Sequence, residues 1–286
     1  MDPSERRHLF GLAYRMLGTA ADAEDAVQET YLRYYRLSDD ERAAIREPRA
    51  WLTRVAGRVC LDALGSARRR RERYVGEWLP EPLPAHEPGS PDPLEQVSLD
   101  ESVSTALLVV LDTLTPAERV AYVLHEVFAV PYAQIAEVVG RSPDACRQLA
   151  ASARRRIREE GRAVPTPRDR HDEVVRAFVA ACRGGDLAAL LTVLDPAVAL
   201  RSDGGGLVSA ARRPVLGADP VARFLLGAIA KSHGTTVTER ATGDGTALAL
   251  ERDGVVVGVA NLGVADGVVS DVWLVLNPEK LGAWVR

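Results

Sequence analysis

Apolar residues recur every three or four positions through residues 4–158, which is the period of amphipathic α-helices. Residues 4–36 predict two helices, separated at Gly18, with Thr19 or Asp22 beginning the second. Residues 37–47 carry few apolar positions and predict an exposed connection. Pro48 then opens a third helix, whose apolar stripe runs into a block of arginines.

The helical period returns in residues 99–158. Gly140 stands at a turn between two apolar helices, and Ser142 followed by Pro143 is placed to begin the second helix. The pattern puts Ile135, Ala136 and Val139 on the inward face of the first helix. This spacing is typical of a helix-turn-helix and equally of an ordinary helical hairpin. In a helix-turn-helix, the outward residues near the start of the second helix meet base edges: Asp144, Arg147 and Gln148.

The pattern changes after residue 168. Residues 171–194 predict two helices broken at Gly184–Asp186, and residues 218–230 predict another. Valine-rich runs with a period of two then predict antiparallel strands joined by tight turns: TTVTERA, TALALERD, VVVGVANLGV and VVSDVWLVL. Helices followed by a strand meander indicate an α+β domain.

A proline-rich stretch lies between the two helical parts. Six prolines fall between Pro80 and Pro93, which predicts an extended linker. Tyr74, Val75, Trp78 and Leu79 precede it, and apolar residues in a linker are expected to dock on a folded surface. The domains expected from these boundaries are residues 1–73, a linker at 74–98, residues 99–160 and residues 169–286.

Composition narrows the class of protein. Of 286 residues, 47% are hydrophobic and 27% are charged, which is ordinary for a soluble globular protein. No apolar run is long enough to span a membrane, and the first residues lack the apolar stretch of a secretory signal. Cys60, Cys146 and Cys182 lie far apart in apolar helical patterns, so we expect reduced thiols in a cytoplasmic protein, without zinc or disulfides.

The net charge of −4 excludes a molecule that is basic overall, but the arginines are clustered. One block holds Arg68, Arg69, Arg70, Arg71 and Arg73, and another holds Arg154, Arg155, Arg156 and Arg158. Such blocks suit contacts with DNA phosphates. They also suit solvated helix ends, where cations favour the helix dipole.

Three stretches resemble the extracytoplasmic-function family of RNA polymerase sigma factors: AEDAVQETYLR, PRAWLTRVAGRVCLDALGSARRRR and LTPAERVAYVLHEVFAVPYAQIAEVVGRSPDACRQLAASARRRI. Their order and the proline-rich linker fit that family. The tail, from GDLAALLTVLDPAVALRSDGGG through the strand meander, resembles a SnoaL-like domain, the cone-shaped fold shared with ketosteroid isomerases. A subgroup of these sigma factors carries such an extension, and its marks are present here: YVGEWLPEP, DGGG and NPEKL.

The resemblance implies two all-α sigma domains, the second with a helix-turn-helix, followed by an α+β SnoaL-like domain. It implies initiation at alternative promoters with core RNA polymerase and promoter DNA as partners. It also implies control by the tail itself in place of a separate anti-sigma factor. The connection at residues 37–47 corresponds to where the family holds a flipped promoter base. A stand-alone helix-turn-helix regulator, and a SnoaL-type enzyme fused to a DNA-binding arm, are the alternatives.

The implied site residues fall into four groups. Core polymerase is expected to contact an acidic helix face, which otherwise reads as a solvated face: Asp22, Glu24, Asp25, Gln28, Glu29 and Leu32. The −10 element is assigned to Arg54, Arg58, Arg68, Arg69, Arg70 and Arg71. The −35 element is assigned to Ser142, Asp144, Arg147, Gln148, Arg154 and Arg155. Interdomain control is assigned to Tyr74, Trp78, Leu79, Pro80, Asp203, Gly204, Gly205, Gly206, Asn277, Pro278, Lys280 and Leu281.

The stretch RSDGGG at residues 201–206 has two interpretations. It is a plain hairpin turn, or its glycines permit a close backbone approach while Asp203 accepts hydrogen bonds from the linker. Enzyme relatives use an acid and a base in a pocket, and the candidates here are Asp195, Asp203, Asp219 and His233. Asp195 reads as a turn residue and Asp219 as a helix N-cap, so we expect no catalysis, cofactor or metal. Binding of a small effector in the domain's pocket is a further alternative.

Overall fold

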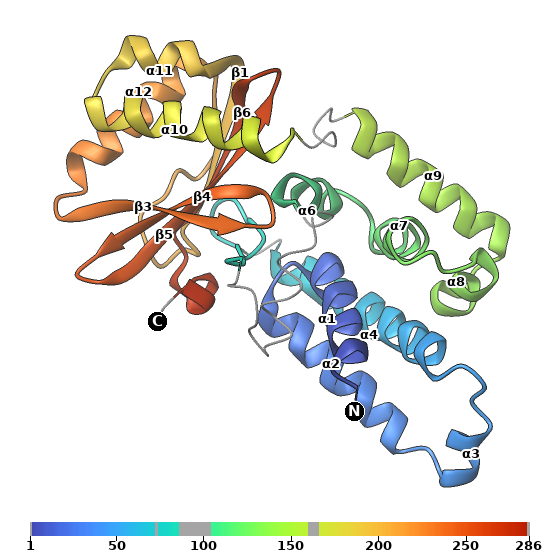
Figure 1. Ribbon diagram of the computed structural model, residues 1–286. Helices are drawn as coiled ribbons and strands as arrows, with labels where there is room; N and C mark the ends of the chain where they lie inside the picture. Colours follow the sequence, from blue (N-terminus) through green and yellow to red (C-terminus); the bar gives the residue numbers. More distant parts are fainter. Residues whose placement is uncertain (1, 72–73, 86–103, 160–165, 285–286) are drawn as a thin grey trace. The chain divides into compact units, whose positions relative to one another are not determined.

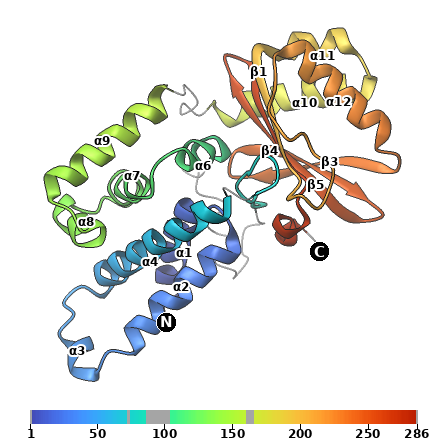
Figure 2. The same ribbon diagram turned by 180° about the vertical axis from the view of Figure 1, so that it is seen from behind.

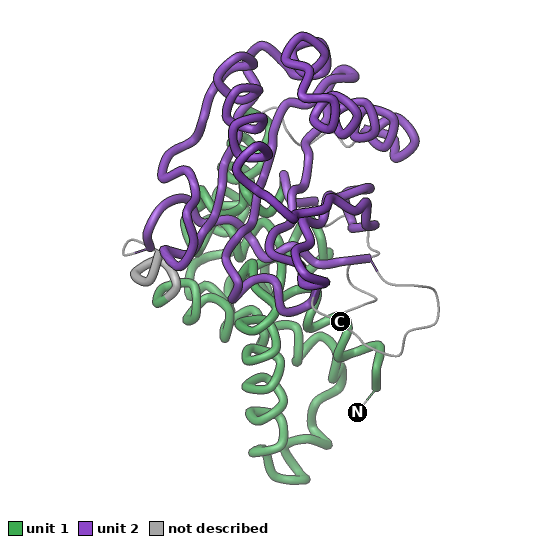
Figure 3. Tube along the Cα trace, turned by 90° about the vertical axis from the view of Figure 1, so that its left-hand side faces the viewer, with its two compact units in different colours: residues 1–73, 89–103, 107–163 green, residues 74–88, 104–106, 164–286 purple. Residues whose placement is uncertain are grey.

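The computed structural model describes residues 2–71, 74–85, 104–159 and 166–284, without the side chains of residues 67–71 (Figures 1 and 2). The chain forms two compact units (Figure 3). Unit 1 comprises residues 1–73, 89–103 and 107–163, and unit 2 comprises residues 74–88, 104–106 and 164–286. The short stretches 74–88 and 104–106, far from the tail in sequence, therefore group with it.

Unit 1 is helical. Its elements are α1 (Pro3–Leu17), α2 (Ala20–Tyr35), α3 (Asp39–Ala43), α4 (Pro48–Arg71), most of α6 (Thr105–Asp112), α7 (Pro116–Tyr122), a π-helix (Val123–Val127), α8 (Tyr132–Val139) and α9 (Pro143–Glu159). Gly18 ends α1 in the left-handed conformation, with φ of 81°. Thr19 is the N-cap of α2, since its side chain accepts from the backbone N–H of Asp22.

Two local expectations for unit 1 need correction. The connection at residues 37–47 is largely exposed but contains α3, because Ser38 and Glu41 form a reciprocal capping box. On α8 the buried residues are Ile135 and Val138, not Val139. The turn itself follows the prediction: Gly140 has φ of 72°, and the Ser142 Oγ accepts from the backbone N–H of Ala145 at 3.2 Å.

Unit 2 is an α+β domain. Its elements are α10 (Arg168–Gly184), α11 (Leu187–Val193), β1 (Leu194–Asp203), β2 (Val215–Leu216), α12 (Ala218–Lys231), β3 (Thr235–Thr242), β4 (Gly245–Arg252), β5 (Val255–Ala265), β6 (Val268–Val275) and two 3₁₀ turns, η2 (Pro278–Lys280) and η3 (Gly282–Trp284). The sheet order is β2-β1-β6-β5-β4-β3, with β1 and β6 parallel and the other pairs antiparallel. The fold class expected from the sequence is confirmed.

The three helices of unit 2 cover one face of its sheet (Figures 1 and 2). Phe178 and Leu190 from the helices are buried in one apolar cluster with Leu200, Leu262 and Val272 from the strands. Side chains alternate between the two faces of a strand, so the immediate neighbours of these strand residues belong to the opposite face. By this alternation the opposite face holds three buried polar residues, and the candidate site forms around the first of them: Asp203, Asn261 and Asp271.

Several details of the tail differ from expectation. Gly217, not Asp219, is the N-cap of α12, and Asp219 bonds to Arg223 one turn later. Asp195 lies inside β1, where the pairing with β6 is irregular between Leu194 and Ala199. Within the described ranges, no helix is long and apolar enough to cross a membrane.

Candidate functional site

Asp203 ends β1 as a fully buried carboxylate with four hydrogen-bond donors around it. The Oδ1 atom accepts from the Tyr74 hydroxyl at 2.6 Å and from the Gly205 backbone N–H at 3.0 Å. The Oδ2 atom accepts from the Leu79 backbone N–H at 3.0 Å and from Lys280 Nζ at 2.7 Å. A buried charge is tolerated only when it is paired and hydrogen-bonded in this way. Asp203 thus ties the start of the linker to the tail.

Lys280 completes this arrangement, which we call the Asp203 cluster. Its ammonium group also donates to the Leu79 carbonyl oxygen at 2.5 Å. The Nζ atom lies 4.1 Å from the centre of the Trp78 ring and 5.2 Å from that of Tyr74, so two aromatic rings flank the cation. Lys280 therefore meets the linker by hydrogen bond and by cation–π contact at once.

The NPEKL segment positions Lys280 through Asn277. The Asn277 side chain accepts from the backbone N–H of Glu279 in η2, and its Nδ2 donates to the Tyr74 hydroxyl at 2.8 Å. Trp284, one turn further on, donates from its indole N–H to the Pro82 carbonyl oxygen at 2.8 Å. The 3₁₀ turns at the tail's end thus hold the linker at two points.

Two of the three glycines must be glycine for both conformation and space. Gly205 has φ of 64°, and a Cβ there would lie 2.5 Å from Asn277 Cγ. Gly206 has φ of 74°, and a Cβ there would lie 3.1 Å from Val75 Cβ. A Cβ on Gly204 would lie 2.5 Å from the Val208 carbonyl oxygen. The loop is therefore shaped around the linker and NPEKL, which a plain turn between two strands would not require.

Tyr74 acts as a neutral hydrogen-bond donor in this cluster. Burial, together with the hydrogen bond to the Asp203 carboxylate, raises the pKa of the Tyr74 phenol well above its usual value. The hydroxyl can donate to Asp203 and accept from Asn277 only in its protonated form. The geometry and the protonation state are therefore consistent.

The remaining predicted interdomain residues lie beside the cluster. Pro80 and Leu281 are buried, whereas Pro278 is exposed. Glu81 and Trp284 are buried as well and were not predicted, although the WLPEP stretch contains the first of them. A polar hollow of about 150 Å³ opens next to Gly204 and Gly206, and its lining includes Val75, Ser202, Ser209 and Arg212.

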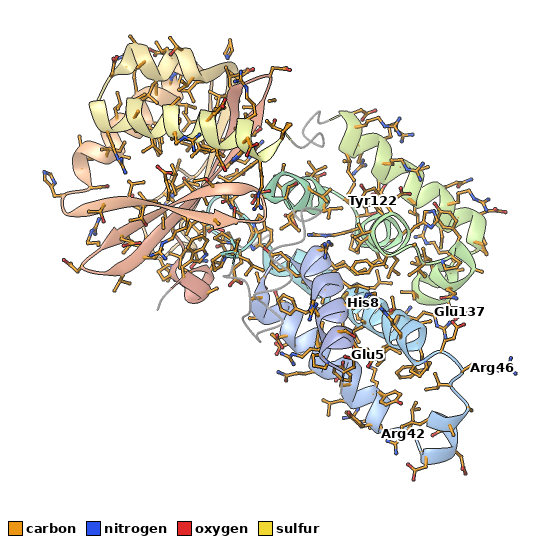
Figure 4. All side chains as sticks on the ribbon, viewed as in Figure 1. Glu5, His8, Arg42, Arg46, Tyr122 and Glu137 are labelled. Atoms are coloured by element: carbon orange, nitrogen blue, oxygen red, sulfur yellow. The ribbon has the colours of Figure 1, made fainter. Side chains whose placement is uncertain are left out.

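In unit 1, two arginines predicted to face the −10 element contact helix α8. Arg58 donates to the Val138 carbonyl oxygen at 3.0 Å, and Arg54 lies 3.7 Å from the Glu137 carboxylate. Figure 4 labels Glu137 on α8 and His8 on α1. Gly57 lies between the two arginines, and a Cβ there would come within 3.3 Å of Leu124 and Val138. Helix α4 thus packs closely on the second helical region.

Arg119 of α7 is a buried contact that the sequence pattern did not indicate. Its Nε donates to the Arg15 carbonyl oxygen at 3.3 Å, and its guanidinium pairs with Asp112 at 3.0 Å. Burial lowers the pKa of Arg119 to about 9. His8 of helix α1 packs edge-on against Phe128, with the two ring centres 5.0 Å apart. Residues of regions distant in sequence therefore form one helical core.

Some residues on the face of α2 that we expect to contact polymerase already pair with other residues of this chain. Glu24 pairs with Arg6, and Glu29 pairs with Arg33 on the same helix. Asp22 accepts from the Thr19 hydroxyl at 2.8 Å. The exposed members of this face are Asp25, Gln28 and Leu32, and Tyr35 adds an exposed aromatic ring that was not predicted.

The predicted −35 residues lie along one exposed helix face. Asp144 and Gln148 are exposed, and Arg147 pairs with Asp144 at 2.7 Å while lying over the Tyr132 ring. Arg154 pairs with Glu126 at 2.6 Å, and Arg155 lies 3.9 Å from Glu159. Of the predicted −10 residues, the following have side chains outside the described part of the chain: Arg68, Arg69, Arg70 and Arg71.

The four acidic or histidine residues considered for catalysis do not form one constellation. Asp203 belongs to the cluster above, Asp219 pairs with Arg223, and Asp195 accepts from the Ala197 backbone N–H. His233 is exposed. Each of the three carboxylates therefore has a structural partner of its own.

Comparisons with known proteins define the class. Residues 4–70 match the model of Sigma-70 region 2, and residues 104–157 match that of Sigma-70, region 4. The ECF RNA polymerase sigma factor SigJ of Mycobacterium tuberculosis is 40% identical, with 96% of this chain and 90% of the relative aligned. The probable ECF RNA polymerase sigma factor SigI of the same organism is 38% identical over 97% and 92%.

A crystal structure of M. tuberculosis SigJ covers 98% of this chain and 97% of its own, with a TM-score of 0.81 and 36% identity. This chain belongs to the extracytoplasmic-function RNA polymerase sigma factors. Its two helical regions are followed by an α+β domain, and the alignment with the SigJ structure, which covers 98% of this chain, includes that domain. The family works with core RNA polymerase and promoter DNA.

Proposed function

We propose that the C-terminal domain controls this sigma factor by holding the segment that joins its two promoter-reading regions. The region 2 match ends at residue 70 and the region 4 match begins at residue 104. The Asp203 cluster binds residues 74–79 of the segment between them. The observation that carries the proposal is the buried Lys280–Asp203 pair around Leu79, which ties this segment to the tail.

Regions 2 and 4 take the roles expected of them. The exposed face of α2, with Asp25, Gln28 and Leu32, would bind core polymerase. Helix α4 would contact the −10 element and α9 the −35 element. The contacts of Arg54 and Arg58 with α8 compete with their use on DNA phosphates, so this form of the chain is a restrained one. A tail that holds the joining segment would replace a separate anti-sigma factor, and holding that segment needs no enzymatic activity.

In vitro transcription with core RNA polymerase tests the proposal. Asp203→Asn keeps the shape of the side chain but removes the charge that Lys280 meets, and Asp253→Asn makes the same change at an exposed turn. We expect Asp203→Asn to release the linker and raise promoter binding and transcription, while Asp253→Asn matches the wild type. Equal activity in all three proteins would refute control by the cluster. A failure of the wild-type protein to bind core polymerase would instead favour a stand-alone helix-turn-helix regulator.

A further inference from the structure

We infer that the tip of the β3–β4 hairpin is a second control site, which anchors the first turn of helix α6 through Asp244 and, from β5, Asn261 and so holds the start of region 4. The inference deepens the proposed function and rests on it. The sequence at this tip, GDG, predicts only a turn. The occupant of the site is a segment of the same chain, residues 104–106, which groups with the C-terminal domain.

Asp244 caps helix α6 from a distant part of the sequence. Both its carboxylate oxygens accept from the Thr105 backbone N–H, at 3.0 and 2.9 Å, and Oδ2 also accepts from the Thr105 hydroxyl at 2.5 Å. Thr105 is the first residue of α6, where the backbone N–H has no partner within the helix. A carboxylate there also meets the positive end of the helix dipole. The first turn of α6 contains no acidic residue of its own.

Asn261 of β5 makes the anchor specific for Thr105. Its Nδ2 donates to the Thr105 hydroxyl at 2.9 Å, so this hydroxyl both accepts from Asn261 and donates to Asp244. Both Asn261 and Thr105 are buried. A serine or threonine is required at this position for the full set of bonds, because an alanine keeps only the backbone N–H.

The other end of the connecting segment meets the same hairpin. The Ala85 backbone N–H donates to the Ala241 carbonyl oxygen at 2.7 Å, and Pro84 forms an isolated bridge with Thr242. Strand β3 is the edge of the sheet, and an edge strand offers its outer backbone groups to another extended segment. Residues 241–244 therefore hold both ends of the segment that runs from Ala85 to Thr105.

Both ends of this segment are held, so the restraint on α6 depends more on the anchor at the hairpin tip than on the length of the segment. The entropic cost of joining the ends of a chain segment grows only slowly with length, roughly as the logarithm of its residue number. The restraint on α6 is therefore set mainly by the tip and only weakly by the length of the proline-rich stretch. Release of Asp244 frees the start of region 4, whereas release of Asp203 frees the chain that follows region 2.

The hairpin tip is itself held by the C-terminal domain. Arg168 donates to the Thr242 carbonyl oxygen at 2.6 Å, and Asp172 accepts from the Thr246 backbone N–H at 2.9 Å. Gly245 has φ of 116°, and a Cβ there would lie 2.7 Å from His171 Nδ1. The tip is thus fixed on α10 by contacts that do not involve α6.

The charge of Asp244 is opposed by burial and supported by its neighbours. Burial raises the pKa of Asp244, while the hydrogen bonds from Thr105 and the nearby His171 and Arg168 work in the opposite direction. Thr105 is therefore one of the groups that keep this buried carboxylate charged.

Hydrogen exchange of the full-length protein, read by mass spectrometry, tests the anchor. The variants are Asp244→Asn, which keeps one acceptor oxygen and the shape, Asp244→Ala, and the matched control Asp253→Asn at the exposed β4–β5 turn. We expect amides in the first turn of α6 to exchange about tenfold faster in Asp244→Ala, faster by less in Asp244→Asn, and unchanged in Asp253→Asn. Asp203→Asn should accelerate residues 74–79 and leave α6 protected.

Transcription with core polymerase then tests control. We expect Asp244→Asn to change transcription in the same direction as Asp203→Asn. Exchange in α6 that matches the wild type in both Asp244 variants overturns the anchor. Faster exchange with wild-type transcription overturns its role in control, and the result for Asp203→Asn then still decides the proposed function by itself. Rapid exchange throughout α10 and β5 in Asp244→Ala marks an unfolded domain, in which case Asp244→Asn decides alone.

Discussion

Lys280 Nζ lies 2.7 Å from Asp203 Oδ2, and the two side chains are 6% and 0% exposed. Burial of two charges costs several kcal/mol for each ion, which their attraction offsets only when further hydrogen bonds satisfy both groups. Tyr74, Leu79 and Gly205 supply those bonds. The pair therefore favours one arrangement of linker and tail over others, which suits a contact that specifies a state.

Removal of one partner of this pair should release the linker. Lys280→Met leaves the Asp203 charge buried without its cation, and breaking such a pair typically costs about 3–5 kcal/mol. Urea unfolding followed by tryptophan fluorescence measures the change, since Trp78 lies against Lys280. Lys231→Met, at the exposed end of α12, is the matched control and should stay within about 0.5 kcal/mol of the wild type. Equal stability of the two variants would contradict the role of the pair.

A side chain at Gly205 should lower the free energy of unfolding by more than its backbone strain alone would. Gly205→Ala introduces both a left-handed alanine and a clash with Asn277, whereas Gly234→Ala introduces the strain in open space. We expect Gly234→Ala to cost about 1 kcal/mol and Gly205→Ala to exceed it by at least about 1 kcal/mol. The free energy of unfolding in urea provides both values, and equal costs would show that the loop yields without loss.

The packing of α4 on the second helical region can be tested by comparing the stability of two glycine substitutions on α4. Gly65 is exposed and has nothing within 4 Å, so Gly65→Ala should stabilise the protein by about 0.5–1 kcal/mol through helix propensity. Gly57→Ala gains the same propensity but presses on Leu124 and Val138. We expect Gly57→Ala to fall at least about 1 kcal/mol below Gly65→Ala in chemical unfolding. If both substitutions stabilised the protein equally, α4 could not pack closely on Leu124 and Val138.

His8 should make the helical unit sensitive to acid. Burial, with Arg49 and Arg15 nearby, lowers the pKa of His8 from 6.5 to about 4. The folded form therefore binds fewer protons than the unfolded form between these values, so stability is full above pH 6.5 and falls as the pH drops towards 4. His8 is only partly buried, so solvent screening reduces the expected loss to about 1–2 kcal/mol. Thermal unfolding across this range measures it, and His8→Gln should flatten the dependence in that window.

Two arginines of α9 should have different effects on promoter choice. Arg147 lies near the start of the helix, where side chains read base edges, so Arg147→Ala should shift promoter preference by about 1–3 kcal/mol at one position. Arg154 would contact phosphate, so Arg154→Ala should weaken all promoters alike. A promoter library transcribed with core polymerase separates the two. Equal, sequence-independent losses for both variants would refute the assignment.

Much of the fold could be predicted from the sequence because its signals are local. Periods of 3.6 and 2 distinguish helices from strands, and Gly18 and Gly140 end helices as their lack of a Cβ allows. The prediction failed where a local preference competed with tertiary geometry. Asp219 before Pro220 reads as an N-cap, but the Gly217 backbone N–H bonds to the Val198 carbonyl oxygen of β1, and the helix begins directly after this contact.

From the sequence alone we could predict most of the helices, the four strands β3 to β6, the family and the motifs that meet at Asp203. The tertiary structure decided which residues act as partners: Tyr74 meets Asp203 across 129 positions, and Thr105 meets Asp244 across 139. Local periodicity relates neighbours only as far as one or two turns or strands. Partners at such distances are chosen by the folding of the sheet and the burial of its polar face, where each carboxylate must find its donors.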